Sequence, residues 1–111
     1  LKRVWGPIVA HAERKNIRIG IEHCPMLFSR DEWPGGKNLA ISPAIWRRLF
    51  ETFPGPTLGL NLDPSHLLWQ FIDAPRVIRE FADRIYHVHA KDARIDPDRL
   101  YELGVTGLMW H

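Results

Sequence analysis

The stretch Leu58-Gly59-Leu60-Asn61-Leu62-Asp63-Pro64-Ser65-His66 decides the fold of this 111-residue chain. Its leucines alternate with glycine, asparagine and aspartate, which is the two-residue period of a strand with one oily face and one polar face. Pro64 ends the strand just after Asp63, because proline has no N–H with which to continue a hydrogen-bond ladder. His66 follows three residues after Asp63, so we expect the imidazole and the carboxylate to converge at the strand end.

Two other segments alternate in the same way and also carry polar groups at their ends. Residues 17–22 (IRIGIE) place their isoleucines on one face and finish at Glu22. Residues 85–90 (IYHVHA) place His87 and His89 on one face and apolar residues, with Tyr86, on the other. Carboxylates and imidazoles therefore stand at the ends of all three predicted strands.

Amphipathic helical patterns separate these strands and carry capping signals such as Ser42, Asp73 and Asp96. The predicted helices cover residues 7–15, 43–53, 74–81 and 97–103. Helices and strands alternate without a hairpin signal, so the strands should be parallel with right-handed crossovers. The predicted fold class is α/β, with about three parallel strands and intervening helices in a single domain over residues 1–111.

Parallel strands finish at the same edge of a sheet, so Glu22, Asp63 and His89 should be neighbours there. Adjacent strands lie about 4.8 Å apart, which lets inward side chains share one ion. Two carboxylates and an imidazole, without a thiolate, suit a divalent metal such as Mn²⁺, Mg²⁺, Co²⁺ or Zn²⁺. Because the opposite strand faces pack on helices, we expect these polar groups to face a barrel interior.

Each of these residues also has an ordinary structural interpretation. A glutamate at a strand end is often only solvated, and an aspartate before proline often forms a turn. A His-x-His pair can be a buried, hydrogen-bonded pair or an exposed face. The coincidence of three such features at one edge favours a metal or substrate site.

Residues 24–41 have no periodicity, and loops of this length are often lids or binding loops. Phe28 and Trp33 in this segment are predicted either to wall a substrate pocket or merely to pin the loop to the domain.

The composition of the chain argues against a nucleic-acid-binding, disulfide-linked or membrane-spanning protein. The formal charge is +2 without a block of lysines or arginines, so solvated helix faces explain the basic residues better than a nucleic-acid surface does. The single Cys24 allows no internal disulfide, and no signal peptide or membrane-spanning run is present, which predicts a soluble cytoplasmic protein. The chain begins at Leu1 and stops after a glycine-containing turn, so we expect a fragment of a longer protein.

Four motifs resemble the sugar phosphate isomerase/epimerase family, whose fold is the xylose-isomerase-like (β/α)8 TIM barrel. They are Gly20–Met26 (GIEHCPM), Asp31–Gly36 (DEWPGG), Asn61–His66 (NLDPSH) and His87–Asp92 (HVHAKD). The resemblance covers nearly the whole chain, and the last two motifs are its most specific parts. It implies a partial TIM barrel that spans roughly the fifth to the seventh strand.

The resemblance also implies roles for individual residues. Glu22, Asp63 and His89 would be metal ligands. His66, His87 and Lys91 would contact the oxygens of the substrate. The family's fourth ligand is a glutamate at the end of the last barrel strand, outside this sequence, and His23 stands where we would expect an asparagine.

By resemblance, the expected activity is isomerisation or epimerisation of a sugar or sugar phosphate through an enediolate, with Glu22 as both ligand and base. Dehydration of a cyclitol is a related alternative, because it also begins with removal of a proton. Cleavage of DNA at abasic sites would need more metal ligands and a basic surface. A non-catalytic metal-binding or sugar-binding piece is the alternative from another class, and its exposed strand edges would favour a homo-oligomer.

Overall fold

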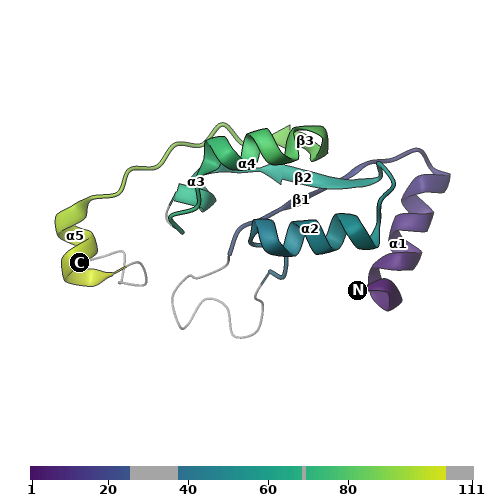
Figure 1. Cartoon of the computed structure of the whole chain (residues 1–111), viewed down its shortest axis with the longest axis horizontal. Helices are drawn as coiled ribbons and strands as arrows, with labels where there is room; N and C mark the ends of the chain where they lie inside the picture. The colour runs from purple at the N-terminus through teal and green to yellow at the C-terminus, as the bar shows by residue number, and fades with distance from the viewer. Residues whose placement is uncertain (26–37, 69, 105–111) are drawn as a thin grey trace.

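The computed structural model describes residues 1–25, 38–68 and 70–104. Within them, helices and strands alternate along the chain, as Figure 1 shows. The elements are α1 (Lys2–Arg14), β1 (Ile19–Glu22), α2 (Pro43–Thr52), β2 (Leu58–Leu62), α3 (Pro64–Leu68), α4 (Ala74–Phe81), η1 (Ala82–Arg84), β3 (Ile85–Val88) and α5 (Pro97–Leu103).

The three strands form one parallel sheet in the order β1-β2-β3. The leucine-rich strand β2 lies in the middle, so the Leu58–Leu62 stretch forms the centre of the sheet. The register pairs Asn61 with Glu22 on one side and with His87 on the other. The predicted α/β class and parallel topology are confirmed, and they correspond to part of a TIM barrel.

The hydrophobic core lies on one face of the sheet. The leucines of β2 are at most 1% exposed, and they pack with Trp46 and Leu49 from α2 and with Val77 and Phe81 from α4. The rings of Trp46 and Phe81 meet edge to face, with their centroids 5.4 Å apart. Each buried leucine contributes roughly 2 kcal/mol to folding. The polar positions of the strands are thereby left to the opposite face.

The first helix differs from its prediction at both ends. It begins at Lys2, and Pro7 lies inside it rather than in its first turn. A proline costs a helix one hydrogen bond, but Trp5 on this helix packs against the core and holds the first turn in place. At the other end, Asn16 adopts a φ of 53°, and the N–H of Ile17 donates to the carbonyl of Ala12. This Schellman-type cap uses Ile17, which explains why β1 begins at Ile19.

Strand β3 also differs from the predicted alternation. Leu60 pairs with Ile85 and Asn61 pairs with His87, so Tyr86 has no partner in β2. The Tyr86 ring lies against Gly59, and its hydroxyl donates to the carbonyl of Pro56 at 2.6 Å. An irregularity of this kind re-aims the residues that follow it.

The chain turns back sharply after β2, in the short helix α3, which the alternation of the strand does not predict. Two capped helices match their predictions: Asp73 accepts the N–H of Arg76 at the start of α4, and Asp96 accepts two N–H groups at the start of α5. Ser42 occupies the expected cap position of α2, but its side chain makes no capping hydrogen bond.

Helices α1 and α5 lie at opposite ends of the molecule (Figure 1). None of the helices in the described ranges has the length and apolar character needed to cross a membrane.

Candidate functional site

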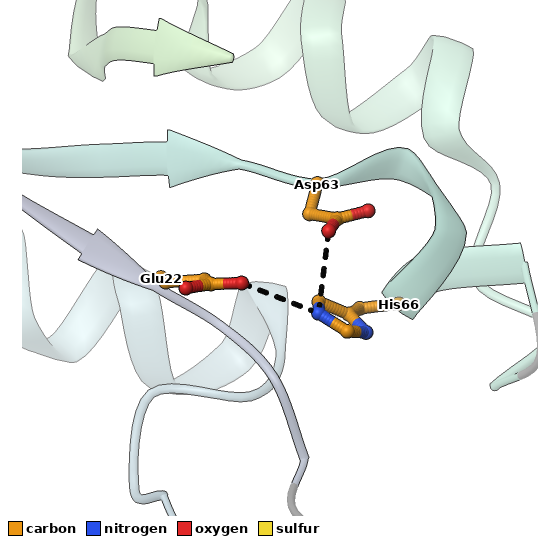
Figure 2. A group of neighbouring side chains, drawn as sticks. All are labelled: Glu22, Asp63 and His66. Atoms are coloured by element: carbon orange, nitrogen blue, oxygen red, sulfur yellow. Dashed lines mark ion pairs between the residues drawn. The ribbon is translucent and has the colours of Figure 1, made fainter. Parts of the chain in front are cut away.

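The candidate site lies at the carboxyl edge of the sheet, where the predicted ligands come together. Glu22 is the last residue of β1, Asp63 directly follows β2, and His66 lies in α3. Figure 2 shows that α3 turns the His66 imidazole back toward both carboxylates. One potential ligand atom from each of these three residues lies within 4.8 Å of the other two. The turn at Pro64 thus produces the convergence that the sequence predicts.

Two imidazoles approach the same pair of carboxylates. His66 Nε2 lies 3.4 Å from Glu22 Oε1 and 3.3 Å from Asp63 Oδ2 (Figure 2). His89, the first residue after β3, places Nδ1 at 3.5 Å and 3.8 Å from the same two oxygens. The structure therefore brings His66 as close to the carboxylates as His89. The division of these histidines into metal ligand and substrate contact stays a prediction.

Asp63 is fully buried, and its two carboxylate oxygens have different surroundings. Oδ1 accepts hydrogen bonds from the backbone N–H and the hydroxyl of Ser65. Oδ2 forms an ion pair with Lys91 Nζ at 2.6 Å and also faces the two imidazoles. Burial by itself raises the pKa of Asp63, but Lys91 and Ser65 more than offset it and lower that pKa to about 2. Asp63 is therefore a carboxylate at neutral pH.

Lys91 places a positive charge against this carboxylate. Its contact with Asp63 raises the pKa of the ammonium, although burial acts in the opposite direction. About half of the Lys91 side chain is exposed, so the ammonium can leave Asp63 for solvent or for another anion. The predicted substrate contact thus lies at the site, paired with the carboxylate that a metal would need.

His23 supports the site through a hydrogen bond to the backbone of Asp63, a role that the sequence did not predict. It is fully buried, its ring packs edge to face on Trp46, and its Nε2 accepts the backbone N–H of Asp63 at 3.0 Å. Burial lowers the pKa of His23 to about 4, so the ring is neutral and free to accept. The available signal was its position, directly after Glu22 and in place of the expected asparagine.

Two asparagines also hold site residues in place. Asn38 donates from Nδ2 to the backbone carbonyl of Glu22 at 2.7 Å. Asn61 lies between the two histidines of the His-x-His motif, 3.0 Å from His87 Nδ1 and 3.2 Å from His89 Nε2. The sequence placed Asn61 on the polar face, in the same motif as Asp63, but gave it no role. Trp33, the predicted pocket wall, lies outside the described residues.

The residues present fit a divalent cation. Asp63 Oδ2 is a buried carboxylate oxygen that faces two imidazoles and the half-exposed ammonium of Lys91, and Glu22 Oε1 lies against the same imidazoles. Carboxylate oxygens with imidazole nitrogens form the donor set of many Mn²⁺, Co²⁺ and Zn²⁺ sites. The carboxyl ends of parallel barrel strands are also where TIM barrels carry their active sites.

Comparison with known proteins agrees with this architecture. The family described as "Xylose isomerase-like TIM barrel" matches residues 1–109. A protein of Bacillus subtilis (strain 168), named "Uncharacterized protein YfiH", is 51% identical over 55 residues. That match covers 50% of this chain and 17% of the Bacillus protein, so the matched segment is a minor part of that relative.

Proposed function

Because this chain belongs to the xylose isomerase-like TIM barrel family, which includes sugar isomerases, epimerases and endonucleases, we propose that it carries most of the metal site of a sugar or sugar phosphate isomerase or epimerase. The observation that carries the proposal is the pair Glu22 and Asp63, bridged by imidazoles at the strand ends. Glu22, Asp63 and His89 would hold the divalent cation, with His66 beside them. When bound, the cation would stabilise negative charge that develops on the substrate's oxygens.

The two carboxylates differ in access, and this difference assigns their roles. The Glu22 side chain is 41% exposed, whereas Asp63 is completely buried. A substrate can therefore reach Glu22 but not Asp63. We assign to Glu22 the removal of the proton from the carbon beside the carbonyl, which yields an enediolate. Asp63 stays ionised and anchors the site.

The exposed basic residues at the same edge suit the substrate's oxygens. His87 is exposed, and about half of the Lys91 side chain is exposed, so both can contact hydroxyl or phosphate groups. His66 lies deeper, with its side chain 12% exposed, and its Nε2 orients the Glu22 carboxylate. Return of the proton requires a second acid, which the family resemblance assigns to a glutamate outside this sequence.

The test is exchange of the substrate's proton with solvent in the complete protein. Ketopentoses and ketohexoses, each free and phosphorylated, are incubated in D₂O with Mn²⁺, and samples are analysed by NMR after the Mn²⁺ has been removed. We expect deuterium to enter beside the carbonyl, and we expect Glu22→Gln to slow this exchange at least about 100-fold, as loss of a general base does. Glu51→Gln, which removes an exposed carboxylate on α2, is the matched control.

Unchanged exchange in Glu22→Gln, with the fold intact by circular dichroism, would remove Glu22 from the mechanism. Loss of water from a cyclitol under the same conditions would identify the dehydratase instead. Metal binding without exchange of any sugar in the panel would favour a non-catalytic binding protein.

A further inference from the structure

The amide of Asn61 joins the two histidines of the His-x-His motif. Asn61 lies on the central strand and is in register with Glu22 and with His87. Its Oδ1 lies 3.0 Å from His87 Nδ1, and its Nδ2 lies 3.2 Å from His89 Nε2. One side chain thus contacts both rings, and on His89 it contacts Nε2, whereas Nδ1 of that ring is the nitrogen near the carboxylates.

These contacts fix the proton positions of both rings when the histidines are neutral. A carbonyl oxygen only accepts, so His87 must carry its proton on Nδ1. An amide NH₂ only donates, so His89 Nε2 must be bare, and His89 carries its proton on Nδ1. That N–H points toward Glu22 Oε1 at 3.5 Å and Asp63 Oδ2 at 3.8 Å. The arrangement is self-consistent without a cation.

A cation held by His89 needs the opposite arrangement. The Nδ1 lone pair must then be free, so the His89 proton must sit on Nε2. A proton on Nε2 meets the NH₂ of Asn61 unless the amide turns over and presents Oδ1 to it. The turned amide then presents Nδ2 to His87 Nδ1, which can accept only if the His87 proton has moved to Nε2. Each ring loses one proton and gains one, so the total number of protons is unchanged.

We propose that Asn61 is a positioning residue that couples metal ligation by His89 to the tautomer of His87. The inference rests on the proposed metal site and goes beyond it, because it links that site to a substrate contact. With the cation bound, His87 offers an Nε2–H donor on its outer edge. Without the cation, the same edge is a bare acceptor. Binding of the cation therefore changes the preferred partner of His87 Nε2. Without the cation this nitrogen accepts from a substrate donor, and with the cation its N–H donates to a substrate acceptor, such as a carbonyl or phosphate oxygen.

The tautomers can be read directly by NMR. The complete protein, labelled with ¹⁵N-histidine, is examined at about pH 8 by long-range ¹H–¹⁵N correlation, before and after addition of Zn²⁺, which is diamagnetic. His87→Phe identifies the signals of His87 by their loss. We expect both His87 and His89 to move from the Nδ1–H form to the Nε2–H form on addition of Zn²⁺, and calorimetry on the same sample measures binding independently.

Asn61→Asp breaks the coupling while keeping the shape of the side chain. A carboxylate accepts at both ends, so His89 should carry its proton on Nε2 with or without Zn²⁺, and His87 should keep its Nδ1–H throughout. Zn²⁺ binding with a constant His87 tautomer in the unsubstituted protein would overturn the coupling and leave the metal site standing. Absence of Zn²⁺ binding would remove the metal site, and the coupling with it.

Discussion

At the scale of single residues, Asp63 does more than form a turn. Its Oδ1 makes the local hydrogen bonds to Ser65 that a turn-forming aspartate before proline makes. Its Oδ2 takes no part in the turn and faces Lys91, His66 and His89. Oδ1 therefore matches the turn-forming interpretation, and Oδ2 is the oxygen that the proposed metal site would use.

The low pKa of Asp63 makes the metal-free protein sensitive to acid. The carboxyl has a pKa of about 2 in the folded chain, against an ordinary value of 3.8, so ionisation favours the folded state. This contribution is fully present above about pH 5 and is lost as the pH falls toward about 2, and it amounts to about 2 kcal/mol at neutral pH. In EDTA, we expect the difference in unfolding free energy between the wild type and Asp63→Asn to shrink by about 1 kcal/mol between pH 7 and pH 3. Parallel pH profiles for the two proteins would contradict this.

His23 should contribute to stability through a single hydrogen bond. His23→Phe keeps an aromatic ring against Trp46 but leaves the buried N–H of Asp63 without an acceptor. We expect the unfolding free energy in urea to fall by about 1–3 kcal/mol. His11→Phe, on the exposed side of α1, should change it by no more than about 0.5 kcal/mol. Equal stability of the two variants would show that the hydrogen bond from the Asp63 N–H to His23 does not contribute to stability.

At the scale of elements, the sequence predicts the sheet well because each strand carries its own signal. The alternation around Leu60 and the polar ends at Glu22 and Asp63 need no tertiary information. The missed features depend on contacts between distant residues. Tyr86 leaves the ladder because its ring lies on Gly59, and His66 approaches the carboxylates as closely as His89 because α3 turns the chain back.

Gly59 is required where β2 meets β3. A Cβ built at this position would overlap the carbonyl oxygen of Arg84 and the ring of Tyr86. We expect Gly59→Ala to lower the unfolding free energy by about 1–3 kcal/mol, because neither the backbone nor the packed ring can retreat freely. Gly6→Ala is the matched control, since nothing lies within 4 Å of its Cβ in α1, and it should stabilise the protein by about 0.5–1 kcal/mol. Thermal or urea unfolding of both variants measures these changes. An unchanged unfolding free energy in Gly59→Ala would contradict the steric requirement for glycine at this position.

At the scale of the whole molecule, the described residues form a sheet that is covered by helices on one face. Within these ranges β1 and β3 each pair only with β2, and the opposite face carries the polar groups of the site. A TIM barrel closes such a sheet so that this face lines its interior and mouth. The family membership and the position of the site at the strand ends thus describe the same architecture.

The site itself could be predicted only in part from the sequence, for a reason that applies to the whole molecule. Strand ends bring Glu22, Asp63 and His89 to one edge whatever the details of packing, so topology alone predicts their meeting. The support from His23 and Asn61 depends on side-chain directions across the sheet, which no local pattern encodes. The second acid is assigned only by the family resemblance, so no residue of this sequence could be predicted for that role.

A titration with Mn²⁺ shows whether the strand ends hold a divalent cation through Asp63. Calorimetry is carried out on the complete protein, on Asp63→Asn, and on Asp92→Asn, which removes an exposed carboxylate close to the same edge. We expect one Mn²⁺ site in the unsubstituted protein and in Asp92→Asn, and an affinity at least about 100-fold weaker in Asp63→Asn, because a ligand is lost rather than a supporting group. Equal binding of Mn²⁺ by all three folded proteins, or by none of them, would contradict a cation site that depends on Asp63.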